Sequence, residues 1–341
     1  MEQNGKVFYL SARSYSENSA GIRCMHLLCH TLNQLGFKAF LVPIDKRFKL
    51  NPTLETPILT RELRDLHVKL EHKTISVFDE SILKDPLNGT VSVRWLLNRS
   101  GFLGGKIFSK EEAKIMVFVL AKEIDPNKER LSVSTVDFNF FRDTFEVEER
   151  SLRLFYGGKL RSLGVEVRKP DDTVEIFRSG SRKQTREELR ELFYRSKVFY
   201  LAEDSALALE AAICGCPTVH LKEYFEFEPL SQEDGGVGLA KSDSPLDLQR
   251  VDLSRDFIER YMYRLQIRSL RDALNFSLMV EAQIKQSIQI KKTRYKISKG
   301  TKVSFRIWKL LAGYRKSGLR GLFGVFLSHI NLKAGDRERS Q

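Results

Sequence analysis

Three acidic side chains and a serine lie close together in the stretch 198–221. Glu203, Asp204 and Ser205 follow an apolar run, and Glu210 lies a little further on. Carboxylates accept hydrogen bonds from sugar hydroxyls. Free backbone N–H groups at a helix start, with small side chains at Ser205 and Ala206, suit a phosphate. These residue types in this order indicate binding of a phosphorylated sugar.

Glu210 is a special case because it lies inside an apolar helix, where a carboxylate is rarely buried unless it is paired. Its partner is either the ribose of a bound nucleotide or a nearby Arg or Lys. For Glu203 and Asp204 the alternative to a sugar contact is capping of the helix and complementing its dipole, and the two roles are compatible.

A glycine pair followed by basic residues forms a second candidate site. Gly158 precedes Lys159 and Arg161, just after a predicted strand at 153–156. Such a turn cradles a diphosphate, although similar turns are common without a ligand. A nucleoside diphosphate leaves with developing negative charge, which cations and helix N-termini stabilise. We therefore expect Lys159 and Arg161 to neutralise a diphosphate.

Three residues of the N-terminal part complete the candidate set. Gly21 stands at a helix start, where it would let another molecule approach the backbone, and Arg23 is beside it. Glu80 follows a predicted strand and is, by position, the catalytic candidate that binds or activates an acceptor hydroxyl. The alternatives are a tight helix start for Gly21 and a solvated carboxylate for Glu80.

The cysteines and histidines do not predict a metal site. Cys24, Cys29, Cys214 and Cys216 have spacings that do not fit a zinc site, and we expect them to be buried, reduced thiols. His26 and His30 lie on one predicted helix without a visible third ligand, and no DxD motif supports a metal here.

The stretch 198–221 is organised as a βαβ unit. A strand at 198–201 is followed by a helix at 206–214, a stop at Gly215 and a strand at 218–221. The helix therefore begins at the carboxyl end of a strand, which is where open α/β sheets bind ligands.

The same alternation recurs along the chain and predicts an α/β fold. The first part has a strand at 6–10, a helix at 22–35 and a strand at 39–42. The second has a strand at 175–178 and a helix at 185–195, where Thr185 and Glu188 make a capping box. Further strands are expected at 74–78, 90–96, 114–120 and 131–136. The segment 137–150 is typical of a connector, and its Phe-Asn-Phe-Phe is expected to pack between domains.

The excess of positive charge is confined to the C-terminal part. The chain has a net charge of +13, and the stretch 282–335 holds 13 Lys and Arg residues without an Asp or Glu, so the remainder sums to zero. This distribution argues against a nucleic-acid-binding body, although a weaker alternative makes the tail a nucleic-acid arm. Residues 291–333 indicate either an interfacial helix on an anionic membrane or a helix that crosses back over the first domain.

Length predicts more than one domain for a chain of 341 residues. We expect an N-terminal domain over 1–150, a nucleotide-sugar domain over 151–250, and C-terminal helices with a basic tail over 251–341. No apolar run reaches the roughly 18 residues of a membrane helix, and no signal peptide is expected. The sequence thus predicts a cytoplasmic protein, peripheral at the inner face of the plasma membrane if the tail binds lipid.

Four segments in order resemble GT-B glycosyltransferases of the bacterial polysaccharide, family-4-like kind. They are GIRCMHLLCHTLNQLGFKAFLV, VFDESILKDPLNGTVSVRWLLNRSG, YGGKL and LAEDSALALEAAICGCPTV, and the resemblance covers about residues 7 to 222. The chain departs from the family pattern at Ala202, which stands where the family has the first of two glutamates, with Glu203 directly after it. Asp79 and Asp85 stand where the family segment has Pro and Asn.

The resemblance implies two Rossmann-like domains that face each other across a cleft. It also implies metal-independent transfer of a hexose from a nucleoside-diphosphate sugar, which is the donor substrate, to a glycan or lipid-linked acceptor in polysaccharide biosynthesis. Lys159, Ser205 and Glu210 would hold the donor, and the acceptor would bind near Gly21 and Glu80. The alternatives are a nucleotide-sugar epimerase of the same fold and a non-catalytic glycan-binding or scaffold subunit.

Overall fold

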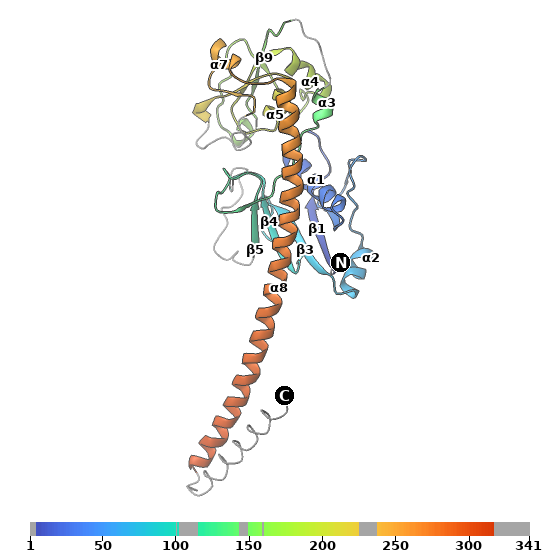
Figure 1. The fold of residues 1–341 in the computed structure, drawn as a ribbon, viewed down its shortest axis with the longest axis vertical. Helices are drawn as coiled ribbons and strands as arrows, with labels where there is room; N and C mark the ends of the chain where they lie inside the picture. Colours follow the sequence, from blue (N-terminus) through green and yellow to red (C-terminus); the bar gives the residue numbers. More distant parts are fainter. Residues whose placement is uncertain are drawn as a thin grey trace. The chain divides into compact units, whose positions relative to one another are not determined.

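The computed structural model describes residues 5–99, 101, 115–142, 149–158, 160–224 and 237–316. By its internal contacts the chain divides into two compact units, Met1–Ala282 and Gln283–Gln341. The first unit contains both β-sheets of the described chain (Figure 1).

The first sheet is parallel and six-stranded, in the order β2-β1-β3-β4-β5-β6. Its strands are β1 (Lys6–Ala12), β2 (Lys38–Pro43), β3 (Lys73–Asp79), β4 (Val91–Leu96), β5 (Ile115–Val119) and β6 (Glu129–Arg130). Helix α1 (Ala20–Gln34) joins β1 to β2, and α2 (Arg61–Lys69) lies between β2 and β3. The Ser19 hydroxyl caps α1 by accepting a hydrogen bond from the N–H of Ile22.

The second sheet is also parallel and has five strands, in the order β11-β10-β9-β7-β8. Its strands are β7 (Leu152–Tyr156), β8 (Val174–Glu175), β9 (Ser196–Leu201), β10 (Thr218–His220) and β11 (Leu239–Ala240). Its main helices are α4 (Arg186–Tyr194), which has the predicted capping box, and α5 (Leu207–Ile213). The shorter pieces are α3 (Phe138–Arg142), η2 (Arg161–Leu163), η3 (Lys222–Tyr224) and α7 (Pro245–Gln249).

The predicted fold class is confirmed, because both sheets are parallel and carry helices in their connections. Most strand predictions agree with the structure to within a few residues. The strand expected at 131–136 is wrong, since pairing ends at β6. The reason is that side chains satisfy the backbone there. Ser132 N–H donates to Asp272, and Ser134 N–H donates to the Ser269 hydroxyl.

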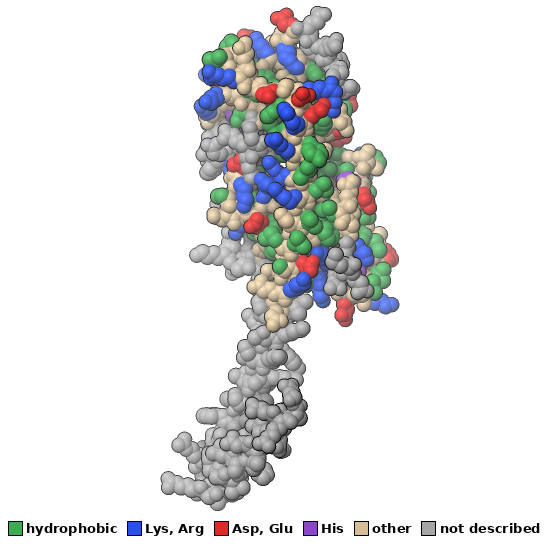
Figure 2. Space-filling view, viewed as in Figure 1, with side chains coloured by type: hydrophobic (Ala, Val, Ile, Leu, Met, Phe, Trp, Pro, Cys, Tyr) green, Lys and Arg blue, Asp and Glu red, His purple; other side chains and the backbone are tan. Residues whose placement is uncertain are grey.

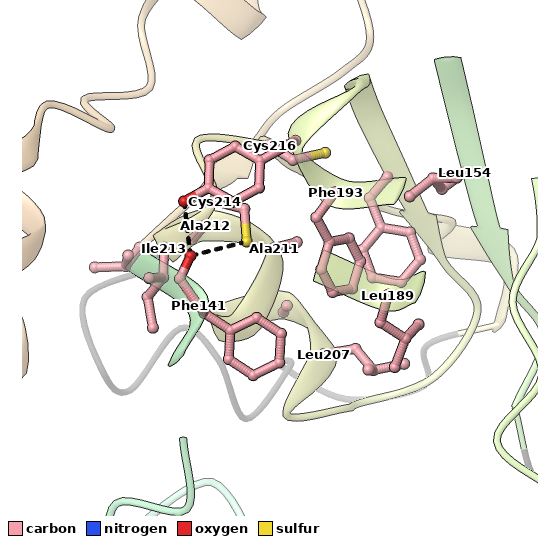
Figure 3. Packing of buried hydrophobic residues seen from close by; sticks show 14 of the residues in the cluster. Phe141, Leu154, Leu189, Phe193, Leu207, Ala211, Ala212, Ile213, Cys214 and Cys216 are labelled. Carbon is pink, nitrogen blue, oxygen red and sulfur yellow. Dashed lines mark hydrogen bonds between the residues drawn. The ribbon is translucent and has the colours of Figure 1, made fainter. Parts of the chain in front are cut away.

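The core of the second sheet includes the aromatic segment that the sequence placed between domains. Phe141, on α3, is buried among residues of α4, α5 and β9, so that expectation is wrong. Figure 3 shows how its carbonyl oxygen is held: it accepts hydrogen bonds from the Tyr194 hydroxyl at 2.8 Å and the Cys214 thiol at 3.4 Å. This packing fixes α5, which carries the candidate residue Glu210, against the sheet.

Helix α8 (Arg255–Lys316) begins in the core of the second sheet and continues over the first. Ile258, Met262 and Leu265 pack into the second core. Farther along, the Phe276 ring lies 5.0 Å from that of Phe118 and 5.7 Å from that of Phe8. Within the first unit, α8 therefore ties the two sheets together.

Candidate functional site

Both sheets have the same topological switch point. In the first, β1 lies between β2 and β3, and in the second, β7 lies between β8 and β9. After the central strand, β1 or β7, the next strand in the chain pairs on one side of it and the strand after that pairs on the other side. Ligands of open α/β sheets bind outside the carboxyl ends of the strands at such a point. The loops after β1, β3, β7 and β9 are therefore the places to look for a site.

Most of the predicted site residues follow these four strands. Glu80 directly follows β3, Gly158 follows β7, and the stretch 203–206 follows β9. Gly21 and Arg23 lie in the first turns of α1, which is the helix after β1, and Glu210 lies on α5, after β9. The parallel register places the last residues of β7 and β9, Tyr156 and Leu201, side by side.

Arg23, on a helix of the first sheet, and Glu210, on a helix of the second, form an ion pair. Arg23 Nη1 lies 2.9 Å from Glu210 Oε1, and the side chains are 8% and 1% exposed. Thus the alternative that sequence analysis left open for Glu210, a pairing with an arginine, is present in the structure. The same contact brings two residues predicted to bind one ligand directly together.

Two further arginines bridge the domains at this place. Arg99, which follows β4, pairs with Asp204 at 3.1 Å. Arg178, which follows β8, donates to the backbone carbonyl of Glu17 in the loop after β1, also at 3.1 Å. Neither arginine is among the candidate site residues predicted from the sequence, which favours a solvated loop for Arg178. Their position after a strand of each sheet was the available signal, but only the packing shows where they point.

Several polar atoms at this junction are buried and have no hydrogen-bond partner within the described part of the chain. They are Glu210 Oε2, Arg23 Nε and Arg178 Nη1. Burial lowers the pKa of Arg178 overall. The negative charge of Glu210 opposes this shift, whereas the like charge of Arg23 adds to it. A buried polar atom without a partner costs free energy comparable to a lost hydrogen bond. In the described part of the chain, the hydrogen-bonding capacity of one carboxylate oxygen and of two guanidinium nitrogens is therefore unused at this junction.

Glu203 lies over the glycine turn of β7. Its side chain is buried, it hydrogen-bonds Tyr156, and a Cβ added to Gly158 would collide with its Cδ. Gly158 has a φ of +58°, so both its backbone and its surroundings favour glycine. Burial and, next, the Glu203 charge raise the pKa of the Tyr156 hydroxyl, which therefore stays protonated and donates to Glu203.

Ser205 and Ala206 form the turn into α5. The Ser205 hydroxyl accepts from Leu207 N–H at 3.3 Å, and Ala206 is the N-cap residue, without a side-chain cap. The phosphate contact expected at these residues remains a prediction.

Gly21 and Glu80 both lie next to Leu97, which follows β4 of the first sheet. A Cβ on Gly21 would meet only Leu97, at an ordinary 3.6 Å, so the described chain does not itself require glycine there. Glu80 is buried, and its Oε2 accepts from the Leu97 N–H at 2.9 Å. The carboxylate thus positions the chain after β4. Its catalytic role remains a prediction.

The basic residues after the glycine pair differ in what the structure says of them. Lys159 lies outside the described residues. Arg161 directs its guanidinium to Glu175 Oε1 at 2.9 Å and to the carbonyl of Val167 at 3.2 Å. Arg178 is therefore better placed than Arg161 to supply positive charge at the domain junction.

The structure also bears on metal binding and on membrane insertion. In the ranges that the structure describes, His, Cys, Asp and Glu form no group of three or more that could hold a metal. None of the helices in the described ranges has both the length and the apolar character needed to cross a bilayer.

Comparisons with known proteins give distant structural likenesses. No family model matches the chain, and no curated protein matches it. It is similar to a solved glycosyltransferase from Rickettsia africae ESF-5, with 8% identity and a TM-score of 0.45, over 82% of this chain and 99% of that one. A glycotransferase of kitacinnamycin has 10% identity and a TM-score of 0.41, over 82% and 100%. An alpha-glucosyltransferase in complex with UDP has 14% identity and a TM-score of 0.37, over 80% of this chain and 94% of that one.

Proposed function

We propose that this protein is a glycosyltransferase that moves a sugar from a nucleoside-diphosphate donor to a glycan or lipid-linked acceptor. The observation that supports this most is the junction of Arg23, Arg178 and Glu210. These residues present an unsatisfied carboxylate oxygen and unsatisfied guanidinium N–H groups at the switch points of two parallel sheets. The four segments that resemble GT-B glycosyltransferases contain two of these three residues.

In this proposal Glu210 accepts hydrogen bonds from the ribose hydroxyls of the donor. Its Oε2 is the free acceptor, and Oε1 remains available to Arg23. Glu203, held over Gly158 by its bond from Tyr156, contacts the transferred sugar or stabilises the turn beside it. Asp204, paired with Arg99, links this turn to the first domain.

The diphosphate would be neutralised by Arg178 and Arg23, together with Lys159. In the reaction, the bond between the anomeric carbon and the phosphate oxygen breaks, and a bond to the acceptor hydroxyl oxygen forms. The acceptor proton is released, and the nucleoside diphosphate leaves with its negative charge. Fixed cations at that place lower the barrier because they are already oriented toward the developing charge. We propose that the acceptor lies on the first domain, beside Gly21 and Glu80.

The basic C-terminal segment supports a more specific proposal about the acceptor and about where the enzyme works. Residues 291–316 continue α8, and the stretch 282–335 contains 13 basic residues and no acidic one. A basic segment of this kind is attracted to anionic lipid. We therefore propose that the acceptor is lipid-linked and that the enzyme works at the inner face of the plasma membrane.

Donor binding tests the proposal. Calorimetry with UDP, GDP, ADP and CDP should give saturable binding for at least one of them. In Glu210→Ala we expect the affinity for that ligand to fall by about tenfold or more, as for the loss of a hydrogen bond to a charged group. Glu191→Ala, which removes an exposed carboxylate from α4, is the matched control and should bind as wild type does. If the unmodified protein binds none of the four nucleoside diphosphates, the proposal is wrong.

A further inference from the structure

The described part of α8 has a row of exposed apolar side chains on its outer side. Tyr263, Ile267, Leu270, Leu274 and Leu278 are each 42% to 64% exposed. Their spacing of three or four residues places them on one face of the helix. Figure 2, in the view of Figure 1, shows hydrophobic side chains gathered along the front of the molecule where α8 runs. We call these five residues the α8 stripe.

The opposite face of the same helix is fixed to the first sheet. Asp272 accepts hydrogen bonds from Arg130 and from the Ser132 hydroxyl, and Phe276 packs between aromatic rings of β1 and β5. Lys6 donates to the hydroxyl of Ser277 at 3.0 Å. These contacts determine the rotation of the helix, so the α8 stripe cannot turn inward without breaking them.

Arginines follow the α8 stripe along one side. Arg260, Arg264, Arg268 and Arg271 recur every three or four residues, so on a helix they lie next to the stripe in a parallel row. Arg271 also pairs with Asp272 of the same helix at 3.2 Å. On the other side and at the end of the stripe lie Glu259, paired with Arg142 at 2.8 Å and Arg255 at 3.2 Å, and Glu281, paired with Lys6 at 3.1 Å. An apolar row bordered by positive charge is complementary to a partner surface in which an apolar region lies next to negatively charged groups.

A second copy of the chain does not offer that complementarity. If two α8 helices met in antiparallel fashion, the arginine row of one would face the arginine row of the other. If they met in parallel, the row would face the side of Gln266 and the already paired Glu259. Like charges across an interface oppose association. A lipid surface with anionic headgroups satisfies both the apolar and the basic part.

We infer that the α8 stripe and its arginine row form a docking surface for an anionic membrane. This surface lies in the first compact unit, before the acid-free stretch 282–335, and it adds an apolar contact to the electrostatic attraction of that stretch. Contiguous exposed apolar patches on a soluble domain mark interaction sites. The inference goes beyond the proposed glycosyl transfer and does not depend on it.

The test is flotation of the full chain with vesicles of phosphatidylcholine alone or mixed with phosphatidylserine. The variant Ile267→Ser/Leu274→Ser removes two apolar side chains from the stripe. We expect its partitioning onto the phosphatidylserine vesicles to fall by about tenfold or more. The matched control is Leu66→Ser/Val68→Ser, which removes two exposed apolar side chains from α2 and should float as wild type does.

A second variant tests the arginine row. Arg260→Glu/Arg264→Glu should lose most of the binding to phosphatidylserine vesicles, and far-UV circular dichroism with thermal unfolding should show that all variants fold. Equal flotation of wild type and the stripe variant would overturn the inference, because the basic tail alone would then account for binding. So would a dimer in light scattering that the stripe variant converts to a monomer. Donor binding is measured separately and should not change in any of these variants.

Discussion

Arg23 and Glu210, separated by 187 residues in the sequence, form a buried ion pair that joins the two sheet domains. Breaking a buried pair by removing one partner leaves a charge without compensation and costs about 3–5 kcal/mol. The pair therefore couples the stability of the domain junction to the residue that we propose as the ribose acceptor.

The first prediction concerns this coupling. Arg23→Met and Glu210→Gln should each lower the free energy of unfolding by about 3–5 kcal/mol, and the double variant should cost much less than the sum. Urea unfolding followed by circular dichroism measures the three values. The exposed pair Arg195–Glu191 is the control, and its loss should cost less than about 1 kcal/mol. Additive effects of the Arg23 and Glu210 substitutions would show that the two side chains do not interact in solution.

Gly158 permits a comparison with Gly164. Both have positive φ, +58° and +81°, so alanine at either position should cost about 1 kcal/mol of stability. Only at Gly158 would the new methyl group collide with Glu203, because none of the residues that the structure describes has an atom within 4 Å of a Cβ at Gly164. Gly158→Ala should therefore weaken nucleoside-diphosphate binding in calorimetry, whereas Gly164→Ala should not. If both variants bind equally well, Glu203 and its turn are not part of the donor site.

Arg178 should act on the diphosphate and not on the nucleoside. Arg178→Gln removes the guanidinium that has an unsatisfied N–H at the domain junction. We expect a loss of about 1.5–3 kcal/mol in diphosphate binding, which is roughly 10- to 150-fold in affinity, with little change for the bare nucleoside. Arg182→Gln is the control, because Arg182 lies on the same loop but stacks on the Phe177 ring. An equal effect on nucleoside and diphosphate would place Arg178 elsewhere in the site.

Asp85 gives a prediction about pH. Burial alone would raise the pKa of its carboxyl, but hydrogen bonds from the Ser76 and Ser92 hydroxyls and from the N–H groups of Leu87 and Gly89 lower it overall. Each carboxylate oxygen accepts from one backbone N–H, so an amide at this position would place its NH₂ against a donor. Asp85→Asn should therefore cost about 1–3 kcal/mol at neutral pH.

The sign of the pH dependence follows from the lowered pKa of Asp85. Its stabilising contribution is complete above the unfolded-state pKa of about 3.9 and is lost as pH falls through the lower folded-state value. The difference in unfolding free energy between wild type and Asp85→Asn should therefore shrink as the solution is acidified below about pH 4. Exposed Asp171→Asn is the control. A difference that stays constant with pH would contradict the network.

The sequence was sufficient for the parts of the fold that depend on local pattern. The apolar runs at 6–10 and 198–201 are buried strands, and Thr185 with Glu188 caps α4. The strand expected at 131–136 was wrong because its backbone bonds to Asp272 and Ser269, which lie far along the chain on α8. No local pattern contains that information.

The candidate site likewise combines residues that the sequence could identify with contacts that only the packing reveals. Glu210 could be selected from the sequence, because a carboxylate inside an apolar helix needs a partner. That the partner is Arg23, and that Arg178 points to the same place, depends on how the two domains pack. The ion pair of Arg161 with Glu175 likewise depends on η2 and β8 coming together.

The central claim is that Glu210 holds the ribose of a nucleoside-diphosphate donor. Calorimetry can test it with the best-binding nucleoside diphosphate and its 2′,3′-dideoxy analogue, each titrated into wild type and Glu210→Ala. We predict that loss of the hydroxyls weakens binding to wild type by about tenfold or more but hardly changes binding to Glu210→Ala, because the acceptor is already gone. If the dideoxy analogue loses the same affinity in both proteins, Glu210 does not contact the ribose, and the account is contradicted.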